Sequence, residues 1–227
     1  MYCFYVLLLC TVFISDYPLI TLCYSDCNIS PLLIQYFLKL IIKTIRGIIM
    51  ITLVTGGARS GKSSFAESLY QDRQEVVYIA TARIEDEEMK QRVHLHQTSR
   101  PACWRTYEGT YDLGNALGLE KYYLLDCITI LTSNVLFDLT KDMEIIDEQT
   151  QNIVEEKVCD IIGSLTKQIR DRSLDLVIVT NEVGASLVPE NHLGRVYRDI
   201  VGRINQYAAK NADQVFALFC GIPLQIK

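Results

Sequence analysis

The sequence has no excess of basic residues. Lysine and arginine number 22 against 27 aspartates and glutamates, and the formal net charge is −5. Proteins that bind nucleic acids need clustered positive charge, so this composition argues against a nucleic-acid partner. The chain also contains no internal repeat and no low-complexity segment. At 227 residues it is long enough for one domain with a sizeable core.

Cysteines with the spacing of a metal site or a disulfide framework are also lacking. Of the eight cysteines, four lie in the first 27 residues, and Cys103, Cys127, Cys159 and Cys220 are scattered singly. Scattered thiols are typical of proteins in a reducing compartment. We therefore expect a cytoplasmic location and mostly buried or inert thiols.

Charged side chains are scarce in residues 1–50, which contain only Asp16, Asp26, Lys39, Lys43 and Arg46. The first apolar run, MYCFYVLLLCTVF, is shorter than the ~20 residues that a spanning helix needs. It also lacks the positively charged start of a signal peptide.

The second apolar run, PLLIQYFLKLIIKTIRGIIM, allows three interpretations. Lys39, Lys43 and Arg46 fall on one helical face, as in a helix that lies on a membrane surface or binds a partner. A second interpretation is that the segment is an integral part of the fold. A third is that it is a non-native or disordered extension upstream of a true start at Met50. We favour the last interpretation, which divides the chain into an extension, 1–49, and a nucleotide-binding domain, 50–227.

From residue 51 onward, the pattern alternates between strands and helices. Strands are expected at 51–55, 75–81, 121–129 and 174–184, with two short strands in 214–227. Helices are expected at 62–72, 85–97, 142–170 and 192–213. Alternating β and α units predict a single α/β domain with a mainly parallel sheet flanked by helices.

A phosphate-binding motif, the P-loop, follows the first expected strand. The segment GGARSGKS matches G-x-x-x-x-G-K-[ST] and stands between a strand and a helix, where the motif belongs. Its glycines allow backbone N–H groups to surround phosphate oxygens, and the helix N-terminus favours negative charge. The lysine reaches the outer phosphates and the serine ligates Mg²⁺. The candidate residues are Gly56, Gly57, Ala58, Arg59, Ser60, Gly61, Lys62 and Ser63.

Two acidic residues at the ends of expected strands are candidates to complete a metal site. Asp126 closes YYLLD and Glu182 follows LVIVTN. The carboxyl ends of parallel strands form the mouth where ligands bind such sheets. A capping or surface role is the alternative for either acid alone.

Histidine is rare, and two of the three histidines lie in QRVHLHQTSRPACWRTYE. Cys103 is the one further metal ligand nearby, so a metal site is disfavoured. A neutral imidazole can attack phosphorus and form a phosphoramidate, so a nucleotidyl-histidine is chemically possible at His94 or His96. A solvated helix end is the competing interpretation.

Together the segments LVTGGARSGKSSFAE, YIATA, DEEMKQRVHLHQTSRPACWRT and VTNEVGASLVPENHLGRVYRDIVGRINQ resemble a known family. It is the bifunctional adenosylcobinamide kinase/adenosylcobinamide-phosphate guanylyltransferase, and the resemblance runs from about residue 50 to the end. It implies a P-loop NTPase-like (RecA-like) fold, a homotrimer, and corrinoid substrates with ATP, GTP and Mg²⁺.

The resemblance also implies roles for particular residues. The family's guanylylated histidine stands four residues before an Arg-Pro pair, which selects His96 rather than His94. The P-loop chemistry makes Ser63 and Asp126 the expected metal ligands. Relatives often have Glu at the position of Asp126, and the shorter Asp reaches the nucleotide either directly or through Mg²⁺. Beyond the P-loop, GTP contacts are implied for Ala80, Thr81, Ala82, Gln97, Thr98, Ser99, Arg100, Glu108 and Asp126.

The implied chemistry has two steps. A nucleoside triphosphate phosphorylates adenosylcobinamide, and GTP then passes GMP through His96 to the product, giving adenosyl-GDP-cobinamide and pyrophosphate. Two alternatives stay open on the sequence: a guanylyltransferase without the kinase step, and a P-loop NTP-binding regulator without guanylyl transfer.

Overall fold

The computed structural model describes residues 50–83, 101–143 and 145–227. The N-terminal segment 1–49, the helix expected at 85–97, and the site candidates His94, His96 and Gln97–Arg100 therefore lie outside the described residues. All described residues belong to one compact unit, Ile45–Lys227.

A seven-stranded sheet forms the centre of this unit, in the order β3-β2-β4-β5-β1-β6-β7. All neighbouring strands pair in parallel except β6 and β7, which form an antiparallel hairpin. The expected fold class, a mainly parallel sheet with flanking helices, is confirmed. The strands are β1 Ile51–Gly56, β2 Val76–Ala80, β3 Arg105–Glu108, β4 Tyr122–Asp126, β5 Asp175–Asn181, β6 Gln214–Phe219 and β7 Ile222–Gln225.

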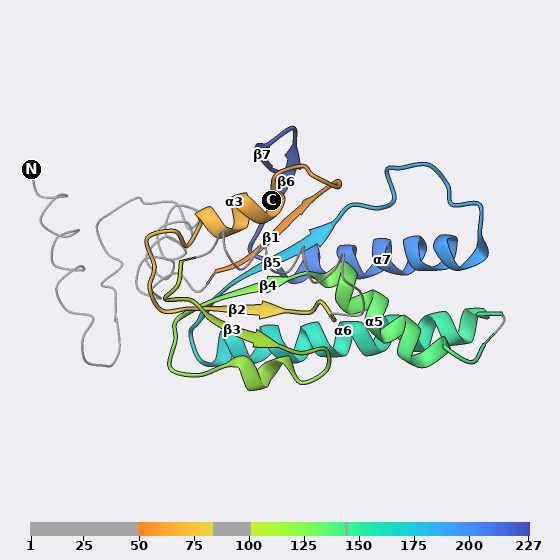
Figure 1. The fold of residues 1–227 in the computed structure, drawn as a ribbon, viewed down its shortest axis with the longest axis horizontal. Helices are drawn as coiled ribbons and strands as arrows, with labels where there is room; N and C mark the ends of the chain where they lie inside the picture. Colours follow the sequence, from red (N-terminus) through yellow and green to blue (C-terminus); the bar gives the residue numbers. More distant parts are fainter. Residues whose placement is uncertain (1–49, 84–100, 144) are drawn as a thin grey trace, which may run out of the picture. The chain divides into compact units, whose positions relative to one another are not determined.

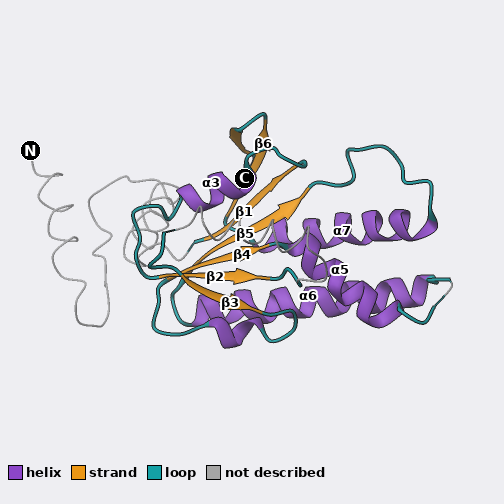
Figure 2. Ribbon diagram, viewed as in Figure 1, coloured by secondary structure: helices purple, strands orange, loops and turns teal. Residues whose placement is uncertain are grey.

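The helices cover the sheet unequally. Figure 1 shows α3 on one side of the sheet and the longer helices α5, α6 and α7 on the other, and Figure 2 shows the strands as a twisted layer between them. Their bounds are α3 Lys62–Ser68, α5 Ile128–Thr140, α6 Glu148–Asp171 and α7 His192–Asn211, with a 3₁₀ helix η1 at Leu113–Ala116. None of the described helices combines the length and the apolarity needed to cross a bilayer.

Alternation along the strands explains the two layers of the core. On β4, Tyr123 and Leu125 belong to the cluster packed against α5, α6 and α7, whereas Leu124 belongs to the cluster on the α3 side. Successive strand side chains point to opposite faces, so one strand supplies both clusters. β5 is buried on both faces, as its continuous apolar sequence predicts.

Helix α5 and strand β3 differ from the expectation. The strand expected at 121–129 ends at Asp126, and helix α5 begins at Ile128. This helix is buried on most of its surface, so its sequence has no amphipathic period and the pattern does not reveal it. The edge strand β3 is also missing from the expectation, because its side chains are mostly exposed and carry no apolar alternation.

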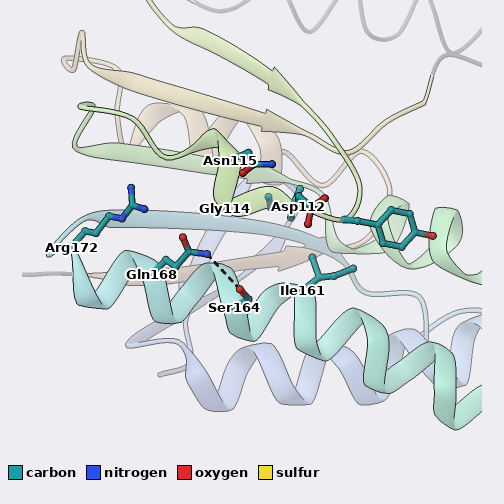
Figure 3. Close-up of a pocket in the computed structure, with 9 residues that line it drawn as sticks. Asp112, Gly114, Asn115, Ile161, Ser164, Gln168 and Arg172 are labelled. Atoms are coloured by element: carbon teal, nitrogen blue, oxygen red, sulfur yellow. Dashed lines mark hydrogen bonds between the residues drawn. The ribbon is translucent and has the colours of Figure 1, made fainter.

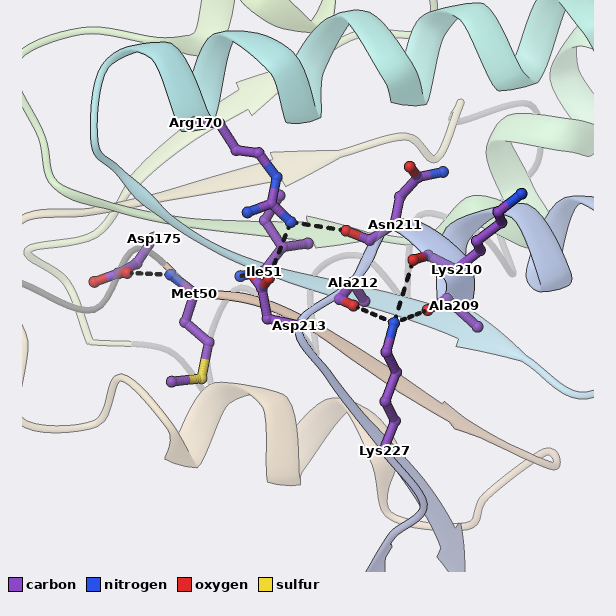
Figure 4. Close-up of polar contacts among 10 residues, drawn as sticks. All are labelled: Met50, Ile51, Arg170, Asp175, Ala209, Lys210, Asn211, Ala212, Asp213 and Lys227. Atoms are coloured by element: carbon purple, nitrogen blue, oxygen red, sulfur yellow. Dashed lines mark hydrogen bonds and ion pairs between the residues drawn. The ribbon is translucent and has the colours of Figure 1, made fainter. Parts of the chain in front are cut away.

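Polar contacts anchor the start of β1 at the amino edge of the sheet (Figure 4). The amide of Met50 donates to Asp175 Oδ1 and that of Ile51 donates to Asp213 Oδ2, both at 2.9 Å. Nearby, the Lys227 ammonium donates to the last carbonyls of α7, Ala209, Lys210 and Ala212. A cation at this position satisfies the free carbonyls of a helix C-terminus.

Candidate functional site

The glycine-rich segment forms a loop between β1 and α3, as its motif predicts. The turn into the helix is made by Gly61, whose φ of 89° is strongly disfavoured for other residues. No side chain caps the helix, and no acidic residue occupies its first turn. The first N–H groups of α3 are therefore directed toward the loop without a side-chain acceptor, which is the arrangement that binds an anion. Lys62 Nζ lies 3.2 Å from the carbonyl oxygen of Gly57 and reaches back over the loop.

The tip of the β6–β7 hairpin supports this loop. The Gly221 amide donates to the Ser60 carbonyl at 2.9 Å. A Cβ on Gly61 would lie 3.2 Å from the Gly221 Cα, and one on Gly56 would lie 2.9 Å from the Leu218 carbonyl oxygen. The glycines of the motif thus allow the loop to approach β6 and the hairpin tip closely. The buried Ser60 hydroxyl has no hydrogen-bond partner among the described residues.

Asp126 lies on the same side of the sheet as the P-loop helix. It follows Leu124 by two positions on β4, and Leu124 faces α3. Its Oδ2 accepts a hydrogen bond from the Tyr78 hydroxyl at 2.5 Å. Burial raises the pKa of the adjacent Cys127 thiol to about 11, with Asp126 adding to the rise and Lys62 opposing it.

Glu182, the other acidic candidate, has a local role. Its Oε1 accepts hydrogen bonds from the amides of Gly184 at 2.7 Å and Ala185 at 3.2 Å. These bonds form the turn that follows β5, so this carboxylate oxygen is already occupied.

Three of the expected contact residues line up across the carboxyl edge of the sheet. Ala80 is in register with Glu108 on one side and with Asp126 on the other. Just beyond them a pocket of about 380 Å³ is lined by Thr81, Ala82, Arg83, Glu108, Gly109 and Thr110. The sheet thus brings Ala80, Ala82, Glu108 and Asp126 to the same edge as the P-loop.

Thr81 has a scaffolding role in this arrangement. Its hydroxyl donates to the Cys127 carbonyl at 2.9 Å and accepts from the Cys127 amide at 3.0 Å. Its amide donates to the Asp126 carbonyl, and its own carbonyl accepts from Asn134 at 2.7 Å. It is 1% exposed. Thr81 therefore joins the ends of β2 and β4, and its hydroxyl bonds to protein groups.

A clamp of Arg83, Asp138 and Tyr111 beside the pocket was not predicted from the sequence. The Arg83 guanidinium makes two hydrogen bonds of 2.6 Å to the Asp138 carboxylate, and the Tyr111 hydroxyl donates to the same carboxylate at 2.6 Å. Hydrogen bonds from Arg83 and Tyr111 lower the pKa of Asp138 to about 2. The clamp ties the segment after β2 to α5. It joins residues far apart in sequence, so no local pattern signals it.

A polar network at the end of β5 was missed as well. Asn181 Nδ2 donates to the Thr129 hydroxyl at 2.5 Å, and the Thr129 hydroxyl lies 3.0 Å from the Cys127 sulfur. The Asn205 amide on α7 donates to the Asn181 carbonyl at 3.0 Å. The ends of β4 and β5 are thus held together where the site opens. Asparagine at the end of an apolar strand is the one sequence signal for it.

A second pocket, of about 230 Å³, lies between η1 and α6 (Figure 3). Polar side chains such as Asp112, Asn115, Gln168 and Arg172 line much of it. It contains none of the residues expected to bind a nucleotide. No group of three or more potential metal ligands occurs within the described residues.

A glycine-rich loop between β1 and its helix, at the carboxyl edge of a parallel sheet, defines a P-loop α/β nucleotide-binding protein. The chain belongs to the family described as cobinamide kinase / cobinamide phosphate guanyltransferase, whose sequence profile matches residues 52–226.

Relatives from three bacteria are similar over nearly their whole length. The chain is 41% identical to the bifunctional adenosylcobalamin biosynthesis protein CobU of Escherichia coli K12 and 42% identical to that of Salmonella typhimurium LT2. Each match spans 182 residues, 78% of this chain and 100% of the relative. The chain is 35% identical to the bifunctional adenosylcobalamin biosynthesis protein CobP of Pseudomonas aeruginosa PAO1, over 77% of this chain and 96% of that protein. A solved KaiC-like protein of Pyrococcus horikoshii OT3 aligns with a TM-score of 0.38 and 12% identity, covering 74% of this chain and 70% of that one.

Proposed function

We propose that this protein phosphorylates adenosylcobinamide with ATP or GTP and then transfers GMP from GTP to the phosphorylated product. The observation that carries the proposal is the P-loop with its uncapped helix, with Asp126 and Glu108 at the same sheet edge, in a chain of this family. In both steps the loop amides and Lys62 bind the phosphates and offset charge that develops on them.

In the guanylyl step, an imidazole nitrogen of His96 attacks the α-phosphorus of GTP. The bond from the α-phosphorus to the bridging oxygen breaks, and pyrophosphate leaves with the electron pair. A phosphate oxygen of the cobinamide phosphate then attacks the same phosphorus, breaks the P–N bond and releases His96. Gln97, Thr98, Ser99 and Arg100 are proposed to contact GTP beside this histidine.

The residues around the P-loop also fit Mg²⁺. Ser63 supplies a hydroxyl oxygen and Asp126 a carboxylate oxygen, the hard donors that this cation prefers. When bound, Mg²⁺ supplies positive charge beside the phosphates. The role of the chain is to hold the two oxygen donors at the end of the loop and at the end of β4.

Three further properties are proposed for the protein as a whole. Residues 50–227 form the P-loop nucleotide-binding kinase/guanylyltransferase domain, and residues 1–49 are a non-native or disordered extension; the match of residues 52–226 supports this division. The domain forms a homotrimer, to be tested by light scattering after size-exclusion chromatography. The protein is cytoplasmic, in agreement with the free thiols of Cys103, Cys127, Cys159 and Cys220.

Incubation with GTP labelled at the α-phosphate, followed by denaturing electrophoresis, tests the proposal. We expect a label on the protein that is stable to alkali and labile to acid, as a phosphoramidate is. An NTP-binding regulator would hydrolyse NTP without forming this adduct. An adduct without phosphorylation of adenosylcobinamide would indicate a guanylyltransferase that lacks the kinase step.

A further inference from the structure

Tyr78 and Asp126 make a close polar contact next to the P-loop. The Tyr78 hydroxyl donates to Asp126 Oδ2 at 2.5 Å, across 48 positions of sequence. A hydrogen bond from a hydroxyl to a carboxylate is shorter and stronger than one between neutral groups. The contact therefore restrains the orientation of the Asp126 carboxylate.

The sheet register places these two side chains on one face. Tyr78 pairs with Leu124 between β2 and β4, and Asp126 is two residues beyond Leu124. Tyr78, Leu124 and Asp126 therefore all point to the α3 side. Tyr78 is 3% exposed and packs in the core cluster of that face, so its ring has little freedom to move. A rigid ring makes its hydroxyl a fixed donor.

The second carboxylate oxygen of Asp126 accepts no hydrogen bond from the residues that the structure describes. The geometry thus leaves one oxygen of a restrained carboxylate available on the sheet face that α3 covers. An aspartate has only two side-chain torsions, so a donor on a buried ring restrains its rotamer.

We propose that Tyr78 is a positioning residue for nucleotide binding, because it holds one oxygen of Asp126 and keeps the other available for Mg²⁺ beside the P-loop. This inference rests on the proposed function. Groups that hydrogen-bond to a metal ligand typically contribute 10- to 100-fold to metal affinity. Tyr78 itself does not touch the phosphates and acts only through Asp126.

The substitution Tyr78→Phe removes the hydroxyl and retains the buried ring. GTP binding to the full-length protein is measured by calorimetry at increasing Mg²⁺ concentrations and in EDTA. In EDTA, we expect the GTP affinity of the variant to stay within twofold of wild type. The Mg²⁺ concentration that gives half of the Mg²⁺-dependent gain in GTP affinity should rise about tenfold. A purely structural role would weaken binding equally in both conditions.

Tyr123→Phe is the matched control. Tyr123 is a fully buried tyrosine on β4 whose hydroxyl bonds to Glu120 and Gly118, and it faces the other side of the sheet. We expect its Mg²⁺ dependence to match wild type even if its melting temperature falls.

A double-mutant cycle makes the test specific to Asp126. If Tyr78 acts through Asp126, then Tyr78→Phe has no further effect on the Mg²⁺ dependence in an Asp126→Ala background. Equal effects in both backgrounds, or a Tyr78→Phe protein with the Mg²⁺ dependence of wild type, would overturn the inference. Failure of wild-type protein to bind GTP at all would instead overturn the proposed function.

Discussion

The amide nitrogen of Gly221 lies 2.9 Å from the carbonyl oxygen of Ser60, so the C-terminal hairpin supports the P-loop by a direct hydrogen bond. Gly221 has a φ of 81°, whereas a Cβ there would meet no atom within 4 Å. A substitution would therefore act through backbone strain and not through a clash.

Gly221→Ala is expected to lower the melting temperature by about 2–4 °C, because the strain is on the order of 1 kcal/mol. We also expect a several-fold loss of GTP affinity, since the loop loses a fixed support. Calorimetry and thermal unfolding measure the two effects. The control is Gly202→Ala, a helical glycine with open space around it, which should raise stability by about 0.5–1 kcal/mol and leave GTP affinity unchanged. Unchanged affinity in Gly221→Ala would show that the hairpin does not position the loop.

Lys62 is the second target. Its ammonium bonds to the Gly57 carbonyl on the exposed surface of the loop, so its removal should leave the unfolding free energy nearly unchanged. We expect Lys62→Ala to lower both kinase and guanylyl-transfer rates by a factor on the order of 10²–10³, because a preorganised charge is lost from the phosphates. Steady-state assays of both reactions measure this. Loss of one reaction alone would indicate separate nucleotide sites.

The Arg83–Asp138 clamp predicts a specific pH dependence of stability. The pKa of Asp138 in the folded protein is about 2, below its ordinary value of 3.8. The stabilisation is therefore fully present above the unfolded pKa and is lost as the pH falls from about 5 to about 2. Both side chains are 35% exposed, so solvent screening keeps the effect modest.

Urea unfolding of wild type and Asp138→Asn between pH 6 and pH 2.5 tests this dependence. We expect the stability difference between the two proteins to shrink as the pH falls. In an Arg83→Gln background, the stability difference that Asp138→Asn makes at pH 6 should be smaller, since the Arg83 substitution removes the main cause of the low pKa of Asp138. A stability difference that is constant across this range would contradict the assignment.

A protein that begins at Met50 should fold. The amide nitrogen of Met50 lies 2.9 Å from Asp175 Oδ1, so a new α-ammonium at this position would pair with a carboxylate. We expect the truncated protein to keep its melting temperature within a few degrees and to retain GTP binding. Asp175→Asn in the truncated protein should lower its melting temperature, since the α-ammonium loses its carboxylate partner. An unfolded truncation would mean that residues 1–49 complete the core.

Local patterns explain what the sequence predicted well. The P-loop could be placed because its strand, glycines and helix are contiguous, and β5 could be placed because its apolar run is continuous. Because side chains alternate between the two faces of a strand, the sequence also predicts that Asp126 lies on the same face of the sheet as Leu124. Helix α5 could not be recognised, because burial on most sides removes the amphipathic period.

Contacts between distant segments could not be predicted. The Tyr78–Asp126 bond depends on the register between β2 and β4, and that pairing leaves no trace in either strand alone. The Arg83–Asp138 clamp likewise depends on how α5 packs against the end of β2. The roles of His96 and of Gln97–Arg100 remain predictions, since these residues lie outside the described part of the chain.

In the proposed reaction, His96 carries GMP between GTP and the corrinoid. The most direct measurement compares covalent labelling by α-labelled GTP in wild type, His96→Ala and the matched variant His94→Ala, with kinase activity assayed in parallel. We expect His96→Ala to lose the label and keep measurable kinase activity, and His94→Ala to keep both. The label in wild type should also decrease below about pH 6.5, where a histidine becomes protonated and cannot attack phosphorus. Covalent GMP on the His96→Ala protein would contradict the claim.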